Sequence, residues 1–252
     1  MFDIINQSST RIKTALAIVS VLIIVGFINS LFLTWALLGL IMLVALNESM
    51  KLFQIENTMI YIYAIVLWLC AYFYPHPHDL IFILGIVFAS ILAYTKNLNK
   101  QLFLPLMYPM VSYLFLLSLY KVYGMSSLLW LLVVVAGADV GAYFTGKSIG
   151  KRSFCTTSPN KTIEGVAGGV ITASVLGVIF SISNIPFLTA FIISFCVAIA
   201  SVFGDLFESY LKREADVKDS GDILPGHGGI LDRTDGYLFG GIAMFILLQY
   251  MM

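Results

Sequence analysis

Long stretches without a charged side chain constrain this chain more than any other feature of its sequence. Two examples are LAIVSVLIIVGFI, which begins at Leu16, and LLWLLVVVAGA, which begins at Leu128. Hydrophobic residues make up 60% of the chain and charged residues only 11%, whereas about 25% of the residues of a soluble domain are charged. Because a helix needs about 20 mostly apolar residues to cross a bilayer, these stretches predict an all-α, polytopic integral membrane protein.

Nine apolar segments have the approximate length of a transmembrane helix. They cover residues 14–29, 31–47, 57–74, 79–95, 102–119, 124–144, 165–182, 186–207 and 236–252. The first two could form one broken helix, but the hydropathy of the second and the polar Asn-Glu-Ser sequence that follows it favour two. With the N-terminus in the cytoplasm, thirteen of the fourteen Lys and Arg residues lie on the cytoplasmic side, and Lys121 is the exception. Cytoplasmic loops are enriched in such residues, so we expect about nine transmembrane helices and a cytoplasmic N-terminus.

The polar residues are concentrated in the second half of the chain. We expect residues 1–120 to form about five N-terminal transmembrane helices, and residues 121–252 to form a C-terminal region that holds the candidate site. This region includes two cytoplasmic loops, 145–165 and 205–235. The loops on the other side are short and weakly polar, which leaves little room for chemistry there. The formal net charge is zero and no basic domain stands out, which argues against a nucleic-acid partner.

The segment SVFGDLFESYLKREAD, residues 201–216, predicts that the eighth helix continues beyond the membrane with a polar face. That face carries Asp205, Ser209, Lys212 and Asp216, with Glu208 at its edge. An ordinary solvated face is the alternative interpretation. Asp205, however, follows directly on an apolar span, where an ionisable residue costs at least a few kcal/mol and is a functional candidate.

The segment KDSGDILPGHGGILDRTD, residues 218–235, combines three kinds of residue that suit a phosphate ligand. Glycines let the backbone approach a phosphate and offer its N–H groups; these are Gly221, Gly226, Gly228 and Gly229. Carboxylates are hard oxygen donors for Mg²⁺; these are Asp219, Asp222, Asp232 and Asp235. Cationic side chains neutralise phosphate oxygens; Lys218 and Arg233 lie in the segment, and Lys212 and Arg213 come just before it. His227 lies between glycines, and binding phosphate or holding the loop are equally open roles for it.

The other cytoplasmic loop has a similar character. Asp139 lies near the inner end of the sixth span, and glycines with Lys147, Lys151 and Arg152 follow it. Lys161 and Glu164 come just before the seventh span, and Thr162 is expected to cap that helix. The basic residues could simply anchor the loop on the cytoplasmic side, or they could contact an anionic lipid head group or a triphosphate.

Four motifs follow one another in this part of the chain. They are DVGAYxxGKxxGK from Asp139, SPxKTxEGxxGG from Ser158, GDLxES from Gly204, and SxLKRxxxxKDxGxxLPGHGGxxDRxD from Ser209. Together they resemble the signature of the phosphatidate cytidylyltransferases, also called CDP-diacylglycerol synthases. The resemblance covers residues 137–235, and the first five helices match that family only in hydropathy and order, with Glu48 as a weak further point.

The resemblance implies a reaction of phospholipid biosynthesis, in which phosphatidate and CTP give CDP-diacylglycerol and pyrophosphate. It implies Mg²⁺ as the cofactor and leaves a second metal ion open. It also implies a multi-pass enzyme of the bacterial inner membrane, with its active site facing the cytoplasm and a homodimeric assembly. Residues 121–252 would then be the catalytic region.

The resemblance also implies roles for individual residues. Asp205 and Asp232 would hold the metal ions. The nucleotide and phosphate pocket would be lined by Ser209, Lys212, Arg213, Lys218, Asp219, His227 and Arg233, together with the glycines Gly226, Gly228 and Gly229. Lys147, Lys151 and Lys161 are candidates for contacts with the lipid or the triphosphate.

The sequence is less compatible with three other functions. A transporter or ion-binding protein would place ionisable groups near the bilayer midplane of several helices, and the first five spans have almost none. A CDP-alcohol phosphotransferase motif begins DxxDG, which Asp232 to Gly236 match, but the chain has no aspartate after Asp235 to complete it. A catalytically inactive scaffold is disfavoured by the intact set of carboxylates.

Overall fold

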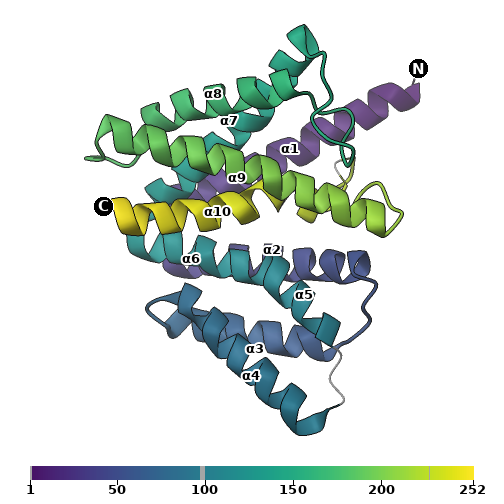
Figure 1. Ribbon diagram of the computed structural model, residues 1–252, viewed down its shortest axis with the longest axis vertical. Coiled ribbons are helices and arrows are strands. Elements are labelled where there is room, and N and C mark those ends of the chain that lie inside the picture. The colour runs from purple at the N-terminus through teal and green to yellow at the C-terminus, as the bar shows by residue number, and fades with distance from the viewer. Residues whose placement is uncertain (1, 97–99, 227) are drawn as a thin grey trace. The chain divides into compact units, whose positions relative to one another are not determined.

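The computed structural model describes residues 2–96, 100–226 and 228–252, and helices dominate this part of the chain (Figure 1). Within it there is no β-sheet, only two isolated antiparallel bridges, Ser153 with Thr162 and Leu224 with Gly228. Each predicted apolar segment falls mainly within helical structure, so the expected all-α class is confirmed.

The helices are, in chain order, α1 (Phe2–Ile28), α2 (Leu31–Leu52), α3 (Met59–Phe73), η1 (Pro77–Asp79), α4 (Leu80–Thr95), η2 (Lys100–Leu102), α5 (Phe103–Pro105), η3 (Leu106–Val111), α6 (Ser112–Tyr123), α7 (Met125–Ile149), α8 (Ile163–Ile179), α9 (Phe187–Glu214) and α10 (Leu231–Met251). Among the described residues, five helical stretches are long and apolar enough to cross a membrane: Leu31–Leu52, Pro77–Thr95, Phe103–Tyr123, Met125–Ile149 and Phe187–Glu214. Shorter apolar helices lie at Ile12–Ile28, Met59–Phe73 and Ile163–Ile179. The structure is therefore that of a helical protein in which several helices have the length and composition to span a membrane.

Local backbone chemistry sets two of the helix boundaries. Between α1 and α2, Asn29 adopts a left-handed conformation with φ of 47°, which asparagine tolerates better than most residues and which commonly ends a helix. The first two apolar segments are thus two helices. The segment expected at 102–119 is less regular than predicted. It contains a π-helix, η3, with Pro109 inside it, and proline cannot donate the backbone hydrogen bond that a regular α-helix requires.

The chain divides into two compact units. The first unit comprises Met1–Leu117 and Glu214–Arg233, and the second comprises Ser118–Arg213 and Thr234–Met252. In the first unit, two tryptophans join α2 to α3. The Trp35 indole N–H donates to the backbone oxygen of Trp68 at 2.9 Å, and the Trp68 indole donates to that of Trp35 at 3.2 Å. Gly39 leaves the space that the Trp68 ring occupies.

In the second unit, glycines let α7 and α8 lie side by side (Figure 1). A Cβ atom on Gly141 would lie 2.6 Å from the Thr172 hydroxyl oxygen, and one on Gly169 would lie 2.5 Å from the backbone oxygen of Ala138. Small residues at such positions allow membrane helices to approach closely and gain van der Waals contact. This contact fixes the ends of the two helices, which flank the loop 150–162.

The close approach of α7 and α8 makes Gly169 sensitive to a single added methyl group. We expect Gly169→Ala to destabilise the protein by about 1–3 kcal/mol, the usual cost of overpacking, because the new Cβ would meet backbone rather than a movable side chain. Thermal unfolding in detergent measures the effect. Gly85→Ala is the matched control, since a Cβ there meets nothing within 4 Å. Equal melting temperatures for the two variants would contradict the proposed contact.

Candidate active site

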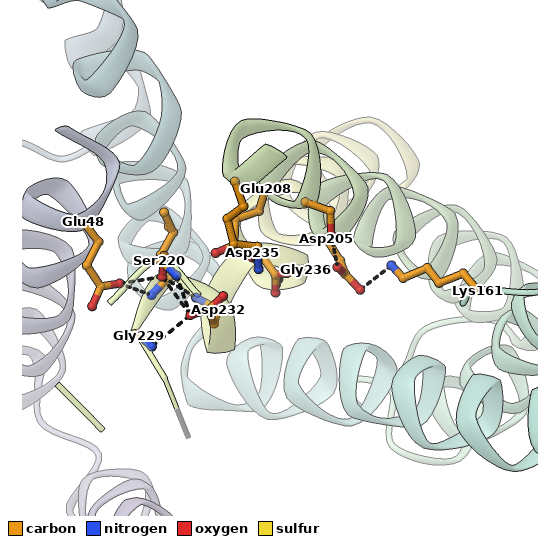
Figure 2. Close-up of polar contacts among 12 residues, drawn as sticks. Glu48, Lys161, Asp205, Glu208, Ser220, Gly229, Asp232, Asp235 and Gly236 are labelled. Atoms are coloured by element: carbon orange, nitrogen blue, oxygen red, sulfur yellow. Dashed lines mark hydrogen bonds and ion pairs between the residues drawn. The ribbon is translucent and has the colours of Figure 1, made fainter. Parts of the chain in front are cut away.

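Asp232, at the start of α10, ties together the glycine-rich segment of the first unit. Its Oδ2 atom accepts hydrogen bonds from the Ser220 backbone N–H at 2.9 Å, the Ser220 hydroxyl at 3.0 Å and the Gly229 N–H at 2.9 Å. Figure 2 shows these contacts converging on one carboxylate. The aspartate therefore folds residues 220 and 229 toward the first turn of α10.

The backbone conformation and the packing of this segment require glycines, in addition to the phosphate binding that the sequence predicts. Gly226 and Gly228 have φ of 77° and 82°, a left-handed region that favours glycine. The Leu224 N–H donates to the Gly228 oxygen at 3.0 Å, which closes a tight turn. His227, for which the sequence left two roles open, lies outside the described residues. Gly229 has no room for a side chain, because a Cβ atom there would meet the Ser220 hydroxyl.

A polar cavity of about 550 Å³ opens on this segment of the first unit. Its lining includes five of the residues predicted from the sequence: Lys218, Asp219, Gly226, Gly228 and Arg233. Gly221, Asp222 and Leu224 complete the lining. Two cationic side chains, two carboxylates and open backbone in one cavity suit a ligand that carries both phosphate and a metal ion.

Asp205 lies on α9 in the second unit, where Lys161 forms an ion pair with its Oδ2 atom. Lys161 comes from the loop that precedes α8, so the pair connects segments that are 44 residues apart. The Ser209 hydroxyl, one turn further along α9, donates to Asp205 Oδ1 at 3.4 Å. The predicted polar face of α9 is therefore present at Asp205 and Ser209, but it does not extend to Asp216. Asp216 lies beyond α9, which ends at Glu214, because the chain leaves the helix there with φ of 54° at Asp216.

A second cavity, of about 540 Å³, surrounds the Lys161–Asp205 pair. Its lining also includes Asp139, Lys147 and Tyr143, and the Lys147 ammonium lies 5.6 Å from the centre of the Tyr143 ring. The rest of its lining is largely small and apolar: Ala138, Ala142, Gly146, Gly165, Val166 and Val202, with Asn160 and Thr162 as polar members. Two lysines beside an apolar wall suit an anionic group attached to an apolar body.

Carboxyl groups of α9 and α10 meet beside Asp205 in the second unit. Asp235 interacts electrostatically with Asp205 and Glu208, and Figure 2 shows the three side chains near one another. Glu208 is fully buried, and the Lys212 ammonium donates to it at 3.0 Å. The helices can approach because Gly204 has no side chain; a Cβ there would lie 2.5 Å from the Asp235 oxygen. Carboxyl groups this close disfavour one another's ionised forms.

The loop that carries Lys161 is held by Glu164. One Glu164 oxygen accepts the backbone N–H groups of Lys151 and Arg152 at 3.1 and 3.2 Å, and the other accepts from the Arg152 side chain at 2.9 Å. These bonds, the Arg152 side chain first, lower the pKa of Glu164 to about 2. A carboxyl group whose pKa is lowered in the folded state stabilises the fold at pH values above its ordinary pKa of 4.5. This stabilisation is lost as the pH falls toward 2. The loop is therefore anchored across the neutral range. Thr162 caps α8 as predicted, accepting from the Gly165 N–H at 3.1 Å.

The sequence-predicted site residues thus fall into two groups. The first unit holds Lys218, Asp219, Gly226, Gly228, Gly229, Asp232 and Arg233. The second holds Lys147, Lys151, Lys161, Asp205, Ser209, Lys212 and Arg213. Two residues without a predicted role also contact the first group, Ser220 and Glu48. Ser220 lies inside the signature segment and could have been predicted from it. The only sequence signal for Glu48 was its weak similarity to the family.

The donor chemistry of Asp205 and Asp232 fits Mg²⁺. In the part of the chain that the structure describes, no group of three or more His, Cys, Asp or Glu residues is arranged to hold a metal ion. Mg²⁺ does not require such a group, because it is usually bound by one or two carboxylates together with ligand phosphates and waters. Asp205 and Asp232 each carry a carboxylate of the kind that Mg²⁺ accepts.

Comparison with known proteins gives matches over nearly the whole chain and others over about half of it. The model of the cytidylyltransferase family matches residues 9–251. A phosphatidate cytidylyltransferase of Helicobacter pylori (strain J99) is 43% identical over 248 residues, which cover 97% of this chain and 93% of that protein. One from Thermotoga maritima is 32% identical over 267 residues, which cover 97% of each chain. One from Bacillus subtilis is 48% identical over 130 residues, which cover 50% of this chain and 48% of that protein.

Proposed function

The chain belongs to the cytidylyltransferase family, and from that premise we propose that it is a phosphatidate cytidylyltransferase. It would transfer CMP from CTP to phosphatidate, giving CDP-diacylglycerol and pyrophosphate in phospholipid biosynthesis. The observation that carries the proposal is the full-length likeness to relatives with that name. The two phosphate-suited cavities are consistent with it, since each contains two cationic side chains and two carboxylates.

The chemistry asks mainly for positioning and charge neutralisation. A phosphate oxygen of phosphatidate attacks the α-phosphorus of CTP, a new P–O–P bond forms, and the bond to the β-phosphate breaks to release pyrophosphate. A phosphate monoester is already largely ionised at neutral pH, so no general base is required. Phosphoryl-type transfers depend mostly on holding the reactants in line and balancing their charge, which is what the basic side chains and the glycine backbone offer.

Asp205 and Asp232 would hold Mg²⁺, which when bound neutralises phosphate charge and steadies the departing pyrophosphate. The polar cavity of the first unit, with Lys218, Asp219 and Arg233, is assigned to the nucleotide and its phosphates. The cavity of the second unit is assigned to phosphatidate. Lys147 and Lys161 would face its phosphate, and the small apolar residues would accommodate the glycerol and the first part of the acyl chains.

The proposed setting is the bacterial inner membrane. The nine apolar segments would all cross it, with the N-terminus and both polar loops in the cytoplasm, as the distribution of Lys and Arg favours. Residues 1–120 would serve as the N-terminal membrane region and residues 121–252 as the catalytic region. A homodimer is part of the proposal. Cysteine-accessibility labelling of intact and permeabilised cells, with single cysteines in loops 145–165 and 75–78, tests the orientation.

The proposed activity is tested with purified protein in detergent. We expect a CMP-bearing lipid to form from CTP and phosphatidate with Mg²⁺, and to disappear when phosphatidate is omitted or the metal is chelated. A parallel reaction with CDP-diacylglycerol and an alcohol phosphate tests the phosphotransferase alternative. Product only in the second reaction, or in neither from folded protein, would refute the proposed activity.

A further inference from the structure

Glu48 is a buried carboxylate that serves the signature segment from the other end of the chain. It lies on α2, and only 1% of its surface is exposed. Its Oε1 atom accepts the Ile230 N–H at 3.0 Å, and its Oε2 atom accepts the Leu231 N–H at 2.7 Å and the Ser220 hydroxyl at 3.0 Å. These partners are between 172 and 183 residues away in sequence. Figure 2 shows the side chain directed at this group.

The signature segment is fitted closely around this carboxylate. A Cβ atom on Gly221 would lie 2.5 Å from Glu48 Oε1, and one on Gly229 would lie 2.5 Å from Glu48 Oε2. Gly221 and Gly229 are therefore both required, because a side chain at either position would collide with the Glu48 carboxylate. Burying a charge is costly unless hydrogen bonds compensate for its lost hydration. The three donors supply these hydrogen bonds to the closely enclosed carboxylate.

The N–H groups that Glu48 accepts lie at the start of α10. The first N–H groups of a helix have no partner within the helix, and an anionic acceptor there is also favoured by the helix dipole. Glu48 thus caps α10 from a different helix. The capped turn contains Asp232, so the carboxylate of α2 helps to set where Asp232 points.

Ser220 makes the connection to Asp232 direct. Its hydroxyl oxygen lies 3.0 Å from Glu48 Oε2 and 3.0 Å from Asp232 Oδ2, and it accepts the Asp232 N–H at 3.3 Å. A hydroxyl has one hydrogen to donate, so it serves the two carboxylates alternately while holding them at a fixed separation. A change at Glu48 can therefore be transmitted to Asp232 through Ser220 as well as through the start of α10.

We propose that Glu48 is a positioning residue for nucleotidyl transfer, which holds the 218–231 segment and Asp232 in the arrangement that binds the metal and the triphosphate. This role rests on the proposed function, because it concerns the same site. Glu48 itself touches neither substrate. It acts through Ser220, through the start of α10 and through the glycines that surround it.

Glu48→Gln tests the proposal, because the amide keeps the shape but turns one acceptor into a donor that faces a backbone N–H or the Ser220 hydroxyl. We expect the Mg²⁺ concentration for half-maximal activity to rise about 10–100-fold, the usual effect of altering a residue that supports a metal ligand. We also expect faster hydrogen exchange across residues 218–232 in the protein without metal or substrates. Glu56→Gln, the same change at an exposed residue after α2, should alter neither.

Each outcome decides the question. Normal exchange across 218–232, or a normal Mg²⁺ requirement, in Glu48→Gln would overturn the proposal. If that variant fails to fold, Ser220→Ala decides, since it leaves Glu48 on Ile230 and Leu231. It should still fold and should raise the Mg²⁺ requirement, and an unchanged requirement in the folded variant would refute the role. Inactive wild-type protein would refute the proposed function alone, and the exchange measurement would still test Glu48.

Discussion

Replacing Asp232 with asparagine is expected to reduce CDP-diacylglycerol formation by more than about 100-fold, beyond the 10–100-fold range typical of residues that only support a metal ligand. Asparagine has nearly the same shape, and its amide oxygen can still accept from Ser220 and Gly229, as Asp232 Oδ2 does. The fold of the segment should therefore survive while the negative charge is lost. Because Mg²⁺ is bound through carboxylate charge, the loss should appear at every metal concentration.

Initial rates across a Mg²⁺ titration, with melting temperatures measured in the same detergent, check this expectation. Asp216→Asn is the matched control. Asp216 is exposed just beyond α9, and its left-handed backbone is one that asparagine also tolerates. Recovery of the full rate by Asp232→Asn at high Mg²⁺ would show that the carboxylate is not required for the chemical step.

Asp205→Asn is expected to cause a loss of similar size, and to do so through its partnership with Lys161 as well as through the metal. The ion pair with Lys161 lies in the cavity assigned to phosphatidate. Removing either member leaves the other charge without its partner, so Lys161 is no longer held in place beside the lipid phosphate when Asp205 is changed. Groups in direct contact are usually not additive. The double variant Asp205→Asn/Lys161→Met should therefore be little worse than the more affected single variant.

The check is a double-mutant cycle on the apparent second-order rate constant for phosphatidate, with CTP saturating. Strictly additive effects would show that the two residues act independently. An increase in the KM for CTP, with the phosphatidate dependence unchanged, would instead assign this cavity to the nucleotide.

Local sequence patterns predicted much of the fold because the signals were themselves local. The apolar segments coincide with helices, the cap at Thr162 is present, and the polar face of α9 holds the Ser209–Asp205 contact one turn apart. The pattern failed where a neighbouring residue changed the backbone. Pro109 lies in a π-helix where a regular helix was expected, and Asp216 lies in a left-handed turn where a continued helix was expected.

Candidate residues that are close in sequence could be grouped from the sequence alone, whereas contacts between distant residues could not. The signature segment identified Lys218, Asp219 and Arg233, which share a cavity. Glu48 gave no comparable signal, because its donors lie more than 170 residues away and only the fold brings them together. The glycines were interpreted as phosphate-binding backbone. The structure adds that Gly221 and Gly229 are required to accommodate Glu48.

CMP transfer is tested most directly by following the two ends of the CTP phosphate chain in parallel reactions, one with label at the α-phosphorus and one with label at the γ-phosphorus. The α label should enter the organic-soluble lipid, and the γ label should leave as water-soluble pyrophosphate in an equal amount. Both should depend on phosphatidate and Mg²⁺. The γ label in the lipid would mean transfer of the terminal phosphate. An α label that stays in the aqueous phase while pyrophosphate is released would mean hydrolysis, and either result would contradict CMP transfer.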